Sequence, residues 1–310
     1  MGNESVVYID YLESYLDVAS DRLPKWFRRL LYLFYNFWGI IKVNGNSLTL
    51  MCVENGFMNK RMLKNIKKRL SKIELNTVVC ADLFLKSYGF ADFLKELDYE
   101  ILEGKWIYKF LPYDIIKKIS YVKNVDISNL EVSILANQDT DVVIENIKLI
   151  AKECKILNII TDNMNGFYAV EKFFLDEYGI IINVTSNREK SLLHSDLIFN
   201  FDFSIAELKV CNIKQDSILV QMNGEKSERR EGITICSCML NLPYKYLEFF
   251  KDKEHFDDTI LYESLLYYKT SFGGIRRILS EDNIGIRYFI GNNGKIKFRD
   301  LVQKRLDKFE

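Results

Sequence analysis

Short apolar runs alternate with helix-length segments through the middle of the chain. The apolar runs lie at 131–136, 155–161, 180–185, 196–201, 217–222 and 232–239. Two of the segments between them, 142–153 and 167–178, place their apolar residues at helical spacing, and the polar stretch 139–141 provides a helix start before the first. Strands that alternate with helices of this length predict βαβ units with right-handed crossovers and a parallel sheet.

The first third of the chain has a mixed pattern. Strand patterns lie at 6–10, 40–43 and 47–53, the last two on either side of the turn signal Asn44-Gly45, and helix patterns lie at 25–38 and 59–73. Pro24 stands immediately before the first helix pattern, where its missing N–H costs nothing. This segment is therefore predicted to be a mixed α/β module.

The chain has 310 residues, a length that fits about two domains. The polar stretch 124–129 is the predicted boundary, and from residue 246 onward the pattern is mainly helical, with a break at Gly273-Gly274 and a last helix at 298–309. We expect an α/β protein with a mixed module at 1–125, a parallel-sheet module at 126–245, and a helical C-terminal segment at 246–310 packed on the preceding domains.

Charge and composition exclude several classes of protein. Lys plus Arg equals Asp plus Glu, at 43 each, whereas dedicated nucleic-acid binders carry a basic excess. The longest apolar stretch, 26–38, is shorter than the ~20 residues of a membrane span, and the first residues lack the basic start and apolar run of a secretory signal. We therefore expect a cytoplasmic protein with no membrane partner, whose six cysteines are small buried hydrophobes.

Polar residues end two of the apolar runs in the central module. They are Thr185, Ser186, Asn187 and Arg188 after the run 180–185, and Asn200 at the end of the run 196–201. Together with the run 155–161, these segments resemble the dinucleotide-binding Rossmann unit of shikimate and amino-acid dehydrogenases, over less than a quarter of the chain. The resemblance implies a Rossmann-like domain in which residues 185–188 bind the ribose and Asn200 borders the nicotinamide. The arginine at position 188 is typical of family members that prefer NADP.

The turn after the run 155–161 departs from that family. Thr161, Asp162, Asn163 and Gly166 span a window with the spacing of G-x-G-x-x-G, but only the last glycine is present. The carboxylate of Asp162 would repel a phosphate at ~4 Å by several kcal/mol. The leading interpretation is therefore a site without a cofactor, and NADP is the alternative.

Other segments have both a functional and a structural interpretation. The basic helix 59–73 could bind phosphate, RNA or anionic lipid, or it could simply present a solvated face. The pattern of the aromatic helix 25–38 favours packing in the core over binding a partner or a membrane surface. His194 suits a helix cap better than acid–base catalysis. Cys236 and Cys238 lie on one strand face, and no zinc-type spacing occurs.

The leading functional hypothesis is a non-catalytic or degenerate Rossmann-like protein that acts as a regulatory or interaction component. The sequence leaves open whether the protein is an enzyme, and it favours the answer that it is not. Its cleft is expected at 161–166, 185–188 and 200–203. Its partner is expected to be a protein or a small molecule, and the sequence leaves open whether the protein forms a homodimer. One alternative is an NADP-dependent oxidoreductase with an atypical phosphate turn. Another is a nucleic-acid or acidic-partner binder that uses helix 59–73.

Overall fold

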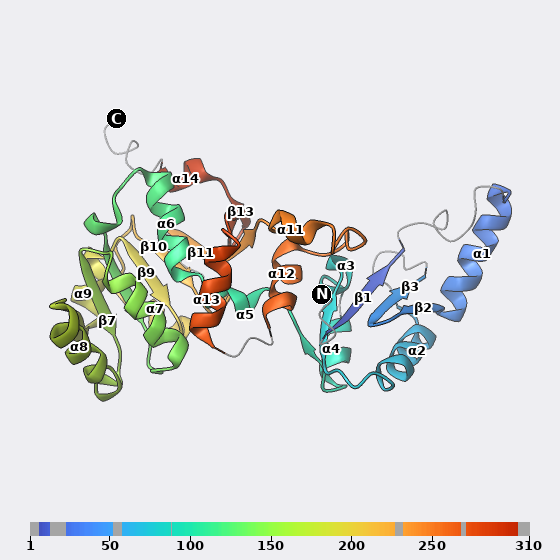
Figure 1. Cartoon of the computed structure of the whole chain (residues 1–310), viewed down its shortest axis with the longest axis horizontal. Helices are drawn as coiled ribbons and strands as arrows, with labels where there is room; N and C mark the ends of the chain where they lie inside the picture. Colours follow the sequence, from blue (N-terminus) through green and yellow to red (C-terminus); the bar gives the residue numbers. More distant parts are fainter. Residues whose placement is uncertain are drawn as a thin grey trace. The chain divides into compact units, whose positions relative to one another are not determined.

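The computed structural model describes residues 6–12, 23–51, 58–87, 89–226, 232–267 and 271–302 (Figure 1). The chain forms two compact units: unit 1 comprises residues 1–104 and 242–268, and unit 2 comprises 105–241 and 269–310. These units do not coincide with the expected segments 1–125, 126–245 and 246–310. The expected boundary at 124–129 contains a short 3-10 helix, η1 (Ile127–Asn129), inside unit 2.

Unit 1 is built on a five-stranded sheet with the order β2-β3-β1-β4-β5. Its strands are β1 (Val7–Tyr11), β2 (Ile41–Asn44), β3 (Ser47–Leu50), β4 (Thr77–Cys80) and β5 (Glu100–Ile101). β1 pairs in parallel with β3 and β4, whereas β2 and β3 form the antiparallel hairpin predicted around Asn44-Gly45. The central strand β1 is buried along most of its length, which explains its uninterrupted apolar start.

The helices of unit 1 come from both ends of the chain. They are α1 (Lys25–Trp38), α2 (Lys60–Leu70), α3 (Asp82–Leu85), α4 (Phe90–Lys95), α11 (Tyr244–Leu247) and α12 (Asp258–Leu266). The returning segment contributes Phe250, Phe256, Ile260 and Leu261 to the same buried cluster as Val7, Ile9 and Leu48. The sequence did not indicate this return, because the segment carries an ordinary helical pattern.

Helix α1 departs from the prediction that the aromatic segment 25–38 packs into a core. Its apolar side chains are largely exposed: Trp26 at 66%, Leu30 at 53%, Leu33 at 55% and Phe34 at 51%. The periodicity correctly predicts an amphipathic helix, but periodicity does not state which neighbour, if any, covers the apolar face. None of the helices in the described ranges is long and apolar enough to cross a bilayer.

Unit 2 contains an eight-stranded sheet with the order β13-β12-β11-β10-β9-β6-β7-β8. Its strands are β6 (Glu131–Leu135), β7 (Ile156–Ile160), β8 (Asn183–Thr185), β9 (Leu197–Asn200), β10 (Ile218–Gln221), β11 (Ile233–Leu240), β12 (Ile286–Gly291) and β13 (Gly294–Ile296). The six strands from β6 to β11 pair in parallel, as predicted. Counted along the chain, their order is 3-2-1-4-5-6, which is that of the Rossmann fold.

The helices of unit 2 are α5 (Lys105–Tyr108), α6 (Pro112–Lys123), α7 (Asp141–Ala151), α8 (Met164–Tyr178), α9 (Arg188–His194), α10 (Ile205–Lys209), α13 (Phe272–Glu281) and α14 (Phe298–Val302). Helix α13 runs through Gly273 and Gly274, where a break was expected, because the Ser271 hydroxyl caps the helix by accepting a hydrogen bond from the Gly274 N–H at 3.1 Å. The C-terminal part is also less helical than expected, since β12 and β13 form a hairpin that extends the sheet antiparallel to β11.

Candidate functional site at the carboxyl edge of the unit 2 sheet

The carboxyl ends of β6 and β9 meet at the point where the strand order of unit 2 reverses. In open α/β sheets, ligands bind in the crevice outside the strand ends at such a switch point. The turn 136–140 after β6 leads into α7, and the turn 201–204 after β9 leads into α10. The turns 161–163 and 186–187, after β7 and β8, lie further along the same edge.

The sheet order changes which turn corresponds to the glycine-rich turn of the Rossmann family. That turn follows the first strand, which is β6, so residues 136–140 occupy its place, with the sequence Ala-Asn-Gln-Asp-Thr. The window 161–166 follows the second strand, and residues 185–188 follow the third. The assignment of 155–161 as the first strand was therefore one strand too late. That assignment rested on Gly166, which stands at the position of the last glycine of G-x-G-x-x-G.

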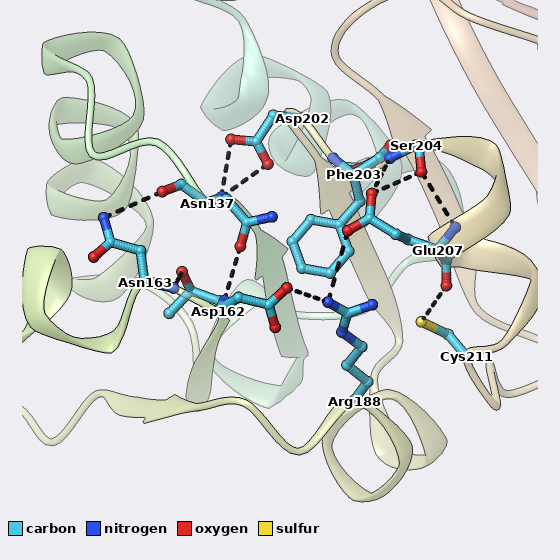
Figure 2. Close-up of polar contacts among 11 residues, drawn as sticks. Asn137, Asp162, Asn163, Arg188, Asp202, Phe203, Ser204, Glu207 and Cys211 are labelled. Carbon is cyan, nitrogen blue, oxygen red and sulfur yellow. Dashed lines mark hydrogen bonds and ion pairs between the residues drawn. The ribbon is translucent and has the colours of Figure 1, made fainter.

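Asp202 places its carboxylate on the backbone amides of the first turn. The N–H of Asn137 donates to both Asp202 oxygens, at 2.8 and 2.9 Å (Figure 2). The N–H of Gln138 donates to Asp202 Oδ2 at 2.8 Å. Adjacent backbone N–H groups form a concavity that binds anions, and bonds to a charged acceptor are the stronger kind. A side chain of the protein itself thus occupies donors that in a Rossmann cofactor site would face the diphosphate.

The first and second turns are also joined to each other. The side-chain oxygen of Asn137 accepts the N–H of Asp162 at 2.8 Å, and the Asn163 side-chain amide donates to the Asn137 carbonyl at 3.3 Å (Figure 2). Asn163 caps α8 by accepting the N–H of Gly166 at 3.2 Å. A Cβ at Gly166 would lie 2.6 Å from Asn163 Nδ2 and 3.0 Å from Asp139 Oδ2, so the glycine permits a close approach between helix α8 and the first turn.

Arg188 lies across the edge between two carboxylates. Its Nη2 is 2.5 Å from Asp162 Oδ2 and 3.7 Å from Glu207 Oε1, and its guanidinium stacks over the Phe203 ring at 4.7 Å (Figure 2). The Arg188 side chain is only 22% exposed. The negative charge of Asp162, which was expected to repel a phosphate, is instead paired within the protein.

Glu207 links this cluster to helix α10. Ser204 and Glu207 form a capping box, in which the Ser204 N–H donates to Glu207 at 2.8 Å and the Glu207 N–H donates to Ser204 Oγ at 3.3 Å. Hydrogen bonds from the Ser204 side chain and backbone, followed by the charge of Arg188, hold the pKa of Glu207 below its usual value. Cys211 donates to the Glu207 carbonyl, and burial raises the pKa of its thiol, so it is not an activated thiolate.

The other predicted site residues serve mainly to shape the edge. Thr161 and Thr185 each accept a backbone N–H two residues on, at 2.9 and 3.0 Å, and Asn187 caps α9. Asn200 is buried; its amide donates to the Phe203 carbonyl and to Gln221 at 2.8 and 2.6 Å. Ser186 is exposed on the same edge. His194 ends α9 just before β9 begins, at the amino end of that strand, away from the turns of the site.

The sequence patterns place the residues of the second, third and fourth turns at one edge, but they do not reveal the roles of Asn137, Ser204 and Glu207. Two signals point to them. Asn137 directly follows a run recognised as a strand, and Ser204 and Glu207 have the S-x-x-E spacing of a capping box. Asp202 lay inside the expected cleft range 200–203. Its role could not be predicted, because the amides that it accepts belong to a turn far away in the sequence.

Comparison with known proteins finds only distant structural similarities. No family model matches the sequence, and no curated protein does. Similar solved structures include the dipicolinate synthase A chain from Bacillus subtilis (TM-score 0.37, 10% identity, 90% of this chain and 96% of that one). They also include shikimate 5-dehydrogenase from Listeria monocytogenes (0.30, 9%, 90% and 97%) and ornithine carbamoyltransferase from Pyrococcus furiosus (0.29, 11%, 74% and 75%). Likenesses of this size carry no argument about function; the Rossmann-like fold rests on the strand order.

Proposed function

We propose that this protein is a Rossmann-like protein without dinucleotide-dependent catalysis, which acts as a regulatory or interaction component for a protein or small-molecule partner. The observation that carries the proposal is the Asp202 carboxylate on the amides of Asn137 and Gln138. A diphosphate and this carboxylate are both anions and compete for the same donors. The internal anion therefore disfavours a bound dinucleotide.

The cost of opening the edge supports the same conclusion. Hydrogen bonds to a charged acceptor are the stronger kind, and a diphosphate would displace three of them at Asp202. Arg188 could bind a 2′-phosphate only by leaving Asp162 and the Phe203 ring. These losses argue against the alternative of an NADP-dependent oxidoreductase.

Ligand titration tests the proposal. Calorimetry and thermal melting of the full-length protein with NADP+, NADPH and NAD+, each at about 1 mM, are expected to show no binding and no rise in Tm. A ligand present at a hundred times its Kd would add about 2.7 kcal/mol to the free energy of unfolding, which melting detects easily. Stoichiometric uptake of NADP(H) by the natural protein would contradict the proposal and favour the oxidoreductase.

The Asp202→Ala variant sharpens this test, because it frees the amides of Asn137 and Gln138 while leaving the sheet intact. If occupation by Asp202 is what excludes a phosphate group, this variant alone should gain measurable affinity for NADPH or pyrophosphate. We place the protein in a reducing, cytoplasmic compartment, since Cys80, Cys236 and Cys238 are buried as small hydrophobic side chains.

A further inference from the structure

Helix α1 presents a continuous apolar stripe to solvent. Trp26, Leu30, Leu33 and Phe34 fall on one side of the helix at intervals of three and four residues, and each is more than half exposed. The opposite side contains Arg28, which is buried, and Leu31 and Tyr35, which are half-buried. An exposed apolar patch of this kind marks an interaction surface more often than a solvated face.

Helix α2 provides a strongly basic surface. Its core side is formed by Met62, Ile66 and Leu70, and its remaining positions include six exposed basic residues and no acid. These are Lys60, Arg61, Lys64, Lys67, Lys68 and Arg69. Between residues 23 and 73 the sequence has eleven Lys and Arg and one acid, although the whole chain is neutral. The positive charge is therefore concentrated on the part of the chain that exposes the apolar stripe.

Several contacts hold the end of α1 against α2 (Figure 1). The Asn65 side-chain amide donates to the carbonyls of Trp38 and Gly39, at 3.3 and 2.9 Å, and the Arg61 guanidinium lies 4.9 Å from the centre of the Trp38 ring. Gly39 has a φ of +59° and packs so closely on Met62 that a Cβ would lie 2.6 Å from the Met62 Cγ atom. The carboxyl end of the apolar helix thus contacts the basic helix directly, at Arg61 and Asn65.

We propose that α1 and α2 form a docking surface for anionic phospholipid membranes, on which α1 lies in the plane of the bilayer. The class of partner follows from chemistry: Trp, Phe and Leu side chains enter the interface between headgroups and acyl chains, and lysines beside them attract anionic headgroups. A second copy of this surface would bring two basic helices together without compensating acids. A nucleic acid would use the basic residues but has no need of exposed Leu30 and Leu33.

This inference concerns unit 1 and is independent of the nucleotide edge in unit 2. The two proposals can fail separately, because one is tested by nucleotide binding and the other by vesicle binding. It also replaces two sequence-based expectations, that the segment 25–38 packs in a core and that no membrane partner exists. The exposed fractions of Trp26, Leu30 and Phe34 motivate the change.

Vesicle sedimentation of the full-length protein tests the proposal. We expect binding to vesicles of phosphatidylcholine with about a quarter phosphatidylglycerol, little binding to pure phosphatidylcholine, and weakening when the salt rises from about 0.1 to about 0.5 M. Leu30→Ser/Phe34→Ser should weaken binding at least about tenfold through lost apolar contact. Lys64→Glu/Lys68→Glu should do so by a similar factor through lost attraction to the headgroups.

Matched variants in unit 2 serve as controls. Leu175→Ser/Tyr168→Ser changes side chains that are 53% and 50% exposed, close to the 53% and 51% of Leu30 and Phe34. Lys172→Glu/Lys190→Glu makes the same charge change at exposed positions. Both controls should bind vesicles like the natural protein.

Three results would overturn the proposal. The first is the absence of binding to anionic vesicles at low salt. The second is retention on RNA that depends on Lys64 and Lys68 but not on Leu30 and Phe34, without vesicle binding. The third is a solution dimer that Leu30→Ser/Phe34→Ser dissociates and that does not bind vesicles.

Discussion

A single carboxylate, that of Asp202, satisfies two backbone amides of a turn that lies more than sixty residues earlier in the sequence. Replacing it by alanine leaves those donors without their acceptor, and an unsatisfied or rehydrated amide site costs about 1–3 kcal/mol. We therefore expect Asp202→Ala to lower the free energy of unfolding by this amount, measured by urea denaturation. Asp202→Asn, which retains an acceptor but no charge, should fall between this variant and the natural protein.

The control for Asp202 is Asp176→Ala on α8, where the side chain is exposed. A surface substitution of this kind changes stability by no more than about 0.5 kcal/mol. If Asp202→Ala were as stable as Asp176→Ala, the three hydrogen bonds would contribute no net stability. The position of Asp202 on the amides of Asn137 and Gln138 would then need another explanation.

Glu207 makes the same edge sensitive to acid. Its pKa is lowered in the folded protein from the ordinary 4.5, first by the hydrogen bonds from Ser204 and then by Arg188. A lowered carboxyl pKa contributes stability above the unfolded value, and this contribution is lost as the pH falls through the folded value. Thermal melts should show the natural protein more stable than Glu207→Gln at pH 7, with the difference shrinking once the pH falls below 4.5 and lost when Glu207 is protonated in the folded protein.

Glutamine keeps the capping-box geometry, so this comparison isolates the charge. Glu177→Gln, at an exposed position of α8, should follow the natural protein at every pH. A difference between the natural protein and Glu207→Gln that did not change between pH 7 and pH 3 would rule out the ionised carboxylate as its cause.

At the scale of elements, the junction between α1 and α2 depends on the lack of a side chain at Gly39. This residue combines a φ of +59° with contacts to Met62 that a Cβ would bring to 2.6–2.9 Å. Gly45 has a similar φ of +54° with no atom within 4 Å of the added Cβ. Gly39→Ala should therefore cost about 1–3 kcal/mol more than Gly45→Ala, because both incur backbone strain but only the first forces the helices apart.

Chemical denaturation of the two glycine variants measures this difference. Gly39→Ala should also weaken anionic vesicle binding, since it displaces α1 from α2, whereas Gly45→Ala should leave that binding unchanged. Equal destabilisation by the two substitutions would show that α1 can shift away from α2 at no cost, and that the two helices do not act as one surface.

The elements also show why sequence patterns predict some features and not others. The apolar runs that became β6, β7 and β9 predict a parallel sheet because strands buried on both faces are apolar throughout. The order of those strands is not encoded locally, so the family's first turn was assigned to 161–166 rather than to 136–140. The hairpin of β12 and β13 was missed, because only Ile286, Phe289 and Gly291 of its two strands are buried.

At the scale of the whole molecule, the chain builds its two units discontinuously. Residues 242–267 belong to unit 1, and Phe250, Phe256, Ile260 and Leu261 lie in its core beside β1 and β4. Two polar contacts connect the same parts of unit 1: the Tyr8 hydroxyl lies 3.0 Å from Ser264 Oγ, and the Gly104 N–H donates to Glu263 at 2.7 Å. No periodic pattern reveals such a return, since it depends on contacts more than 150 residues apart in the sequence.

The discontinuity predicts how fragments behave. A fragment of residues 1–104 loses four core side chains from the returning segment, and removing buried Phe and Leu costs about 2–5 kcal/mol each, which is comparable with the whole stability of a small domain. It should show no cooperative thermal transition by circular dichroism. The longer fragment 1–125 should behave likewise, because its extra residues belong to unit 2.

Joining 1–104 to 242–268 through a flexible Gly/Ser linker of about 12 residues should restore a cooperative transition. The matched control carries Phe250→Ser and Phe256→Ser in the joined fragment and should lose that transition again. Cooperative unfolding of 1–104 alone would mean that the returning segment is an addition to unit 1 rather than a part of its core.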